Sequence, residues 1–148
     1  MRLAVFDTNV LVSAGIRPEG PPARLVTDWV LEGQVQVVTS PWIVAEYREV
    51  VRREKFLRYE FPPFWLEVLI EESLRLPDPE PWPHPVLDPK DAPFLALAHA
   101  AGAWLVTGNL KHFPESARSG VTVLSPAAYL AHLGDISFDP TPPPRPAP

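Results

Sequence analysis

The stretch LAVFDTNVLV, residues 3–12, decides the fold. Its first four residues are all apolar, which favours a short central strand covered on both faces over a half-exposed strand. Asp7 follows at the carboxyl end of this strand, the edge at which ligands bind in open α/β sheets. A simpler explanation stays open: Asp7 or Thr8 caps the helix that starts near Asn9, and for Asp7 taken alone this is the better explanation.

The composition limits the classes of protein to consider. The chain has 148 residues, no cysteine and a formal net charge of -5. This length suits one domain, and the lack of cysteine excludes disulfides and thiolate metal sites and favours a cytoplasmic location. The acidic charge argues against a protein that coats nucleic acid, although an enzyme with a local basic rim remains compatible. No apolar run approaches ~20 residues and the chain starts in a strand, so we expect neither a membrane span nor a signal peptide.

Proline is frequent, with 21 residues, whereas Asn, Gln, Met and Cys are scarce. Rigid loops and few thermolabile residues are typical of thermophiles, and high genomic GC content would produce much of the same pattern. Thermophily is therefore a hypothesis. We expect a single domain over residues 1–133, followed by a proline-rich, flexible tail over residues 134–148.

Strands and helices alternate along the predicted domain. This order indicates an α/β protein with a mostly parallel sheet, whose right-handed crossovers bring the carboxyl ends of the strands to one edge. The proline-rich residues 77–89 predict an extended surface connector, held to the body by Trp82. Strands are expected over residues 3–6, 35–38, 103–106 and 121–124, and helices over 10–16, 21–33, 41–54, 61–76, 91–101 and 126–133.

Two further acids fall at positions that an apolar helix face would occupy. Glu46 lies three residues after Ile43 and four before Val50, so it is either a boundary residue that pairs with an arginine or a buried acid that needs a partner or a metal. Asp91 begins the buried stripe of the next helix, and capping explains it about as well as function does. Asp88 is better explained as a turn acid before a proline than as a site residue.

The strand over residues 103–106 ends in a second small polar segment. Thr107, Gly108 and Asn109 can form a tight connection in which Asn109 adopts a left-handed conformation. They can equally form one wall of a site, with Asn109 or His112 reaching water, metal or phosphate. The sequence leaves both explanations open.

The acids together predict a metal site. Asp7, Glu46 and Asp91 cannot all stay ionised in a poorly hydrated pocket without a cation, and oxygen ligands favour Mg²⁺ or Mn²⁺. Such an ion suits hydrolysis of a phosphodiester. Basic side chains can add phosphate contacts, although a solvated charged helix end is the commoner explanation for most of them. They are Arg48, Arg52, Arg53, Lys55, Arg58, Lys111 and His112.

Four segments resemble the motifs of the PIN domain family and occur in the family's order: FDTNVL at 6–11, SPWIVAE at 40–46, DPKD at 88–91 with residues 94–101, and VTGNLKHFP at 106–114. The resemblance covers residues 1–133 and is nearest to bacterial toxins of toxin–antitoxin pairs, similar to VapC-type ribonucleases. It implies a three-layer α/β/α fold with a central sheet of about five strands. It also implies an endoribonuclease that depends on Mg²⁺ or Mn²⁺.

The resemblance assigns roles to particular residues. Asp7, Glu46 and Asp91 are implied to be the catalytic, metal-binding acids, with Asn9 and Thr107 in support. Many PIN nucleases have a fourth acid in the segment that here offers only Asn109 and His112. An amide can orient water but adds no charge, so this segment offers no fourth charged ligand for a second metal, and Asp88 is the candidate that would replace it.

The expected partners are an RNA substrate, a cognate antitoxin and a second copy of the chain, for which Trp65 and Trp82 are expected to be exposed. One alternative is a phosphatase with an aspartyl nucleophile, but that chemistry wants a second acid where Asn9 stands. The stronger alternative is a PIN-fold module that binds RNA or protein without useful catalysis.

Overall fold

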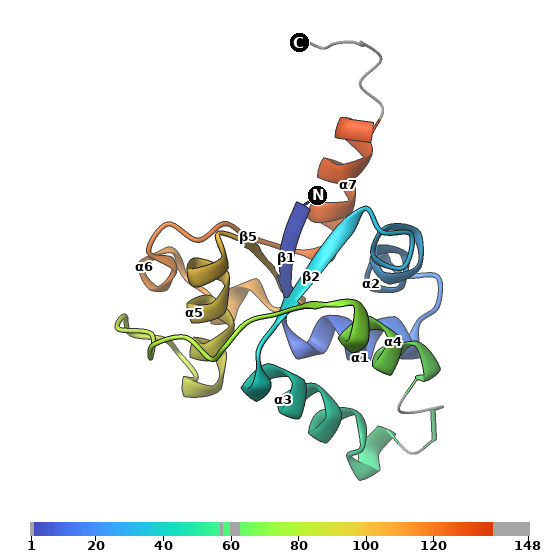
Figure 1. The fold of residues 1–148 in the computed structure, drawn as a ribbon, viewed down its shortest axis with the longest axis horizontal. Coiled ribbons are helices and arrows are strands. Elements are labelled where there is room, and N and C mark those ends of the chain that lie inside the picture. Colours follow the sequence, from blue (N-terminus) through green and yellow to red (C-terminus); the bar gives the residue numbers. More distant parts are fainter. Residues whose placement is uncertain (1, 57, 60–62, 138–148) are drawn as a thin grey trace.

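The computed structural model describes residues 2–56, 58–59 and 63–137, which form one parallel sheet with helices around it (Figure 1). The five strands lie in the order β3-β2-β1-β4-β5. The expected α/β fold with a parallel sheet of about five strands is therefore confirmed. The strands are β1 Arg2–Phe6, β2 Val35–Thr39, β3 Leu74–Arg75, β4 Trp104–Val106 and β5 Val123–Leu124.

The register of the sheet places the ends of β1 and β4 side by side. Phe6 is paired with Val106, and the backbone N–H of Asp7 donates a 2.9 Å hydrogen bond to the Val106 carbonyl. All four strand pairings are parallel, so the carboxyl ends of the strands share one edge. Both segments that the sequence singles out, after β1 and after β4, start at this edge.

Helices cover both faces of the sheet, which gives three layers. In Figure 1, α5 and α6 lie to the left of the sheet and α1, α2 and α4 to the right. Short 3₁₀ turns precede α5 and α6 at Pro89–Asp91 and Leu110–His112. The helices are α1 Thr8–Ile16, α2 Pro21–Arg24, α3 Pro41–Val51, α4 Phe64–Glu72, α5 Ala92–Ala101, α6 Glu115–Arg118 and α7 Pro126–Ser137.

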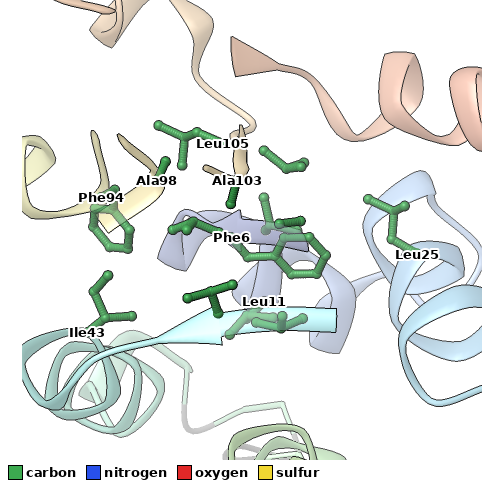
Figure 2. Close-up of a cluster of buried hydrophobic side chains, with 14 of the residues drawn as sticks. Phe6, Leu11, Leu25, Ile43, Phe94, Ala98, Ala103 and Leu105 are labelled. Atoms are coloured by element: carbon green, nitrogen blue, oxygen red, sulfur yellow. The ribbon is translucent and has the colours of Figure 1, made fainter. Parts of the chain in front are cut away.

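The core extends from β1 into the helices on both sides. Phe6 has no exposed surface, and Figure 2 shows it between Leu25, which follows α2, and Phe94 of α5. Five consecutive residues of α5, from Phe94 to Ala98, are buried. A helix buried to this extent is held firmly by packing, so the position of Asp91 at its start is well defined.

The helix expected over residues 61–76 is shorter than predicted. Residues 61 and 62 lie outside the described residues, α4 ends at Glu72, and the chain continues as the edge strand β3. Ser73 adopts an extended backbone, and its hydroxyl donates a 2.6 Å hydrogen bond to the Ile70 carbonyl at the end of α4. Such side-chain hydrogen bonds compete with helix continuation, and a strand of two residues shows no periodicity in sequence.

Other boundaries also differ. The second helix continues beyond α2 as a π-helical segment, Leu25–Val30, and α3 ends at Val51 rather than at residue 54. The last helix, α7, runs to Ser137, four residues beyond the expected end at residue 133. The rest of the predicted tail, from residue 138, lies outside the described residues.

The two outermost strands of the sheet are short. The edge strands β3 and β5 have two residues each, and Pro77 and Pro126 follow them two residues later. Trp82 holds the connector after β3 to the body, as expected, because its indole N–H donates a 2.9 Å hydrogen bond to the Ala117 carbonyl. Among the described helices, none is long and apolar enough to cross a membrane.

Candidate active site

Asp7 lies between the end of β1 and the start of α1, and it is 8% exposed. Its Oδ2 atom accepts a 2.8 Å hydrogen bond from the Thr107 hydroxyl and a 3.3 Å hydrogen bond from the Asn9 amide. Burial raises the pKa of Asp7, while the Thr107 hydrogen bond and the nearby amides of Thr8 and Asn9 oppose that rise. Asp7 is the N-cap residue of α1, but its carboxylate makes no capping hydrogen bond. Its interaction with the start of the helix is limited to the effect of the Thr8 and Asn9 amides on its pKa.

Asp91 lies at the end of the 3₁₀ turn before α5, and it is also 8% exposed. Burial and then the negative charge of Asp7 raise the pKa of Asp91 to about 6, whereas His112 lowers it. The Oδ2 atom of Asp91 lies 3.1 Å from Nδ1 of His112. Its side chain caps nothing, so the capping explanation does not hold for Asp91.

The segment after β4 forms one wall of this site. Gly108 donates a 2.9 Å backbone hydrogen bond to Oδ1 of Asn9, whose amide in turn contacts Asp7. A Cβ atom on Gly108 would lie 3.3 Å from the same Asn9 oxygen, so glycine suits this close approach. The backbone N–H of Asn109 donates a 3.0 Å hydrogen bond to the Thr107 hydroxyl. Asn109 has a φ of -134°, so it does not adopt the left-handed conformation that one of the two open explanations required.

The other two candidate acids are Glu46 and Asp88. Glu46 is half-buried on α3, and among the described residues no group of three or more His, Asp or Glu side chains lies close enough to hold a metal. The charge of Asp7 acts on Asp91, whereas Glu46 is not among the groups that shift the pKa of either aspartate. Asp88 accepts a 3.0 Å hydrogen bond from the Lys90 backbone N–H, the turn role expected for it, and its charge also raises the pKa of Asp91.

Comparison with known proteins identifies the fold family. The PIN domain family matches residues 3–111 of the chain. The chain belongs to the PIN domain family. No curated protein matches it.

Two solved structures share the PIN fold at low sequence identity. The crystal structure of FitAcB from Neisseria gonorrhoeae is 21% identical, with a TM-score of 0.54 over 84% of this chain and 98% of that chain. A structure of FitAB bound to the IR36 DNA fragment is 22% identical, with a TM-score of 0.52 over 83% of this chain and 94% of that chain. At this identity the likeness is one of fold.

PIN domains are generally nucleases and typically use divalent metal ions, and this PIN domain offers such an ion the carboxylates of Asp7 and Asp91 rather than a group of three or more described His, Asp or Glu side chains. The described side-chain contacts engage only the Oδ2 atoms of Asp7 and Asp91, so Oδ1 of each carboxylate faces no side-chain donor. Burial raises the pKa of both acids, and a cation would favour their ionised forms. Oxygen donors of this kind suit a hard cation.

The basic residues after the middle of α3 are engaged with other side chains of the PIN domain. Arg48 makes two hydrogen bonds to Glu67, at 3.0 and 2.7 Å, and Arg53 makes two to Glu49, at 3.2 and 2.7 Å. These pairs are exposed, so they can exchange for other anions at small cost. Their arrangement agrees with the solvated charged helix end that the sequence favours.

Two residues near the site were missed by sequence reasoning. The hydroxyl of Tyr47, on α3, donates a buried hydrogen bond to the Phe6 carbonyl, immediately before Asp7. The hydroxyl of Thr8 is the buried side-chain atom of the described residues that has no hydrogen-bond partner. Tyr47 follows the apolar periodicity of its helix, and Thr8 resembles an ordinary helix-start residue, so neither pattern distinguishes them.

Proposed function

We propose that this PIN domain is a metal-dependent endoribonuclease that hydrolyses phosphodiester bonds in RNA. The observation that carries the proposal is the pair of buried carboxylates, Asp7 and Asp91, at the carboxyl edge of the sheet. Each has a raised pKa, and the negative charge of Asp7 disfavours the ionised form of Asp91. A site that holds two such acids together is unfavourable without a cation or a proton, and for this reason it suggests function rather than stability.

The residues of the site have distinct proposed roles. Asp7 and Asp91 would hold Mg²⁺ or Mn²⁺, which when bound supplies charge neutralisation at the phosphate and activates a water molecule. Thr107 and Asn9 orient the Asp7 carboxylate, because both donate to its Oδ2 atom. His112 orients Asp91. The half-buried Glu46 and the amide of Asn109 are proposed as further contributors that interact with water around the metal.

Cleavage of single-stranded RNA tests this proposal. The purified protein is expected to cut RNA with Mg²⁺ or Mn²⁺ and to stop when a chelator removes the metal. Asp7→Asn and Asp91→Asn are each expected to lower cleavage by at least about a hundredfold while the protein stays folded. Asp28→Asn is the matched control, because Asp28 is an exposed acid away from the site, and it should cut at the wild-type rate. Equal activity in all three variants would refute the assignment.

A PIN-fold module that binds RNA without cleaving it is the second candidate. The specific observation in its favour is that the described residues contain no group of three or more His, Asp or Glu side chains close enough to hold a metal. Binding of several RNAs without cleavage at any Mg²⁺ or Mn²⁺ concentration would support this candidate. Metal-dependent cleavage that is lost in Asp7→Asn would exclude it.

The proposed biological role is that of the toxin in a toxin–antitoxin pair, held inactive in the cytoplasm by a small partner protein. The sequence resemblance to VapC-type ribonucleases supports this role, and so does the fold similarity to FitAcB and FitAB. The gene beside this one is then expected to encode a small protein that forms a stable complex with the PIN domain and suppresses RNA cleavage. A neighbouring product that neither binds nor inhibits would count against the role.

A further inference from the structure

Tyr47 is the residue by which α3 reaches the end of β1. Its side chain has no exposed surface, and its hydroxyl donates to the backbone carbonyl of Phe6. Burial and then the negative charge of Asp7 raise the pKa of Tyr47, so the hydroxyl keeps its proton and remains a donor. This contact spans 41 residues of sequence and ends one residue before the catalytic Asp7.

The Phe6–Asp7 peptide group is held from two sides. Its N–H donates to Val106 of β4, and the carbonyl of a trans peptide points the opposite way, toward β2. The pairing of β1 with β2 runs only as far as Ala4 with Val37, so the Phe6 carbonyl lies beyond the last paired residues. The Tyr47 hydroxyl meets it there. One hydrogen bond to the sheet and one from α3 thus fix the orientation of the Phe6–Asp7 peptide plane, which precedes the Asp7 side chain.

We propose that Tyr47 is a positioning residue of the active site, which sets the orientation of the Asp7 backbone and the distance between β1 and α3. The inference rests on the proposed metal-dependent function of Asp7. Glu46 precedes Tyr47 on α3, so the same hydrogen bond also limits how far Glu46 stands from the aspartate pair. Residues that orient metal ligands through a hydrogen bond affect metal affinity even though they touch neither metal nor substrate.

If Tyr47 only fills space in the core, removal of its hydroxyl should leave metal binding unchanged. The ring of Tyr47 belongs to the hydrophobic core, as does that of Tyr129 on α7, which is 1% exposed. Phenylalanine keeps the ring at either position and removes only the hydroxyl. Tyr129 packs against Trp104 at the beginning of β4, at the opposite edge of the sheet from Asp7. Tyr129→Phe is therefore the matched control for Tyr47→Phe.

The experiment measures binding of Mn²⁺ alone by titration calorimetry in the wild type and both variants, with circular dichroism as the check on folding. Tyr47→Phe is expected to weaken Mn²⁺ binding by about tenfold, the lower end of such effects, and Tyr129→Phe to leave it unchanged. In RNA cleavage, Tyr47→Phe should raise the Mn²⁺ concentration needed for half-maximal rate and leave the KM for RNA unchanged. Replacing Tyr47 with para-aminophenylalanine restores a donor and should restore the affinity.

The results separate this inference from the proposed function. If Tyr47→Phe binds Mn²⁺ as tightly as Tyr129→Phe does, Tyr47 only fills space and the inference is overturned, while the ribonuclease proposal stands. A para-aminophenylalanine variant that folds but binds Mn²⁺ about tenfold more weakly would overturn it as well, even if Tyr47→Phe fails to fold. If the wild type binds no Mn²⁺, the metal site itself is wrong, and the wild-type titration alone reveals it.

Discussion

The Thr107 hydroxyl donates a 2.8 Å hydrogen bond to the Asp7 carboxylate, joining residues that are 100 positions apart in the chain. Thr107 also accepts from the Asn109 backbone N–H, so one hydroxyl fixes both the acid and the loop beside it. This arrangement depends on the parallel pairing of β1 with β4, which brings the ends of the two strands together.

Thr107→Val should therefore disturb both the acid and the loop. Because the hydrogen bond from Thr107 lowers the pKa of Asp7, its loss should raise that pKa further. We expect the acidic limb of the cleavage rate to move to higher pH and the free energy of unfolding to fall by about 1–2 kcal/mol. Thr107→Ser keeps the hydroxyl and should retain the wild-type pH profile. A profile that is unchanged in Thr107→Val would contradict the role assigned to Thr107.

The raised pKa of Asp91 predicts an unusual dependence of stability on pH in the metal-free protein. Between the unfolded value of 3.8 and the folded value of about 6, the folded protein binds more protons at Asp91 than the unfolded chain does. Its contribution to stability is therefore greatest at low pH and is lost as the pH rises through about 6. Melting temperatures measured from pH 4.5 to 8 in a chelator should show this decline. It should be smaller in Asp91→Asn, and a decline of equal size there would assign it to another group.

Gly108→Ala should act on the site through Asn9. The added Cβ would lie 3.3 Å from Oδ1 of Asn9, so Asn9 must move and weaken its hydrogen bond to Asp7. We expect RNA cleavage to fall by about tenfold, equivalent to 1.4 kcal/mol, with little loss of stability. Gly134→Ala on α7 is the control, because a Cβ there meets no atom within 4 Å, and it should leave cleavage unchanged. An unaffected rate in Gly108→Ala would show that Asn9 does not orient Asp7.

Thr8→Val tests the buried hydroxyl that has no partner. An unsatisfied polar group costs free energy when it is buried, and valine has nearly the same shape without the hydroxyl. We expect the free energy of unfolding in denaturant to rise by about 1 kcal/mol. A fall of similar size would mean that the hydroxyl has a partner, such as a water molecule of the site, in solution.

The sequence predicted the parts of this protein that local patterns determine. The apolar runs before Asp7 and Thr107 predicted two strands, which the structure pairs with each other, and their polar ends predicted the edge where the candidate site lies. The edge strand β3 was missed because two residues carry no periodicity, and the end of α4 depends on the hydroxyl of Ser73.

The candidate site was predictable in its residue types more than in its geometry. The order of the four PIN motifs pointed to Asp7 and Asp91, which the fold brings together. The position of Glu46 depends on how α3 packs against β1, and the Tyr47 hydrogen bond that joins these two elements looks in sequence like one more apolar position. Side-chain partners that lie 41 residues apart, as here, leave no local pattern.

The shortness of the two edge strands limits how this PIN domain can meet other proteins. A partner that adds a strand to a sheet needs a row of free backbone N–H and C=O groups, whereas β3 and β5 offer two residues each before the chain turns toward a proline. The shortness of the edge strands also protects the sheet from edge-to-edge pairing with the sheets of other molecules. A protein partner such as the proposed antitoxin is therefore expected to recognise side chains on the surface of the domain rather than to extend its sheet.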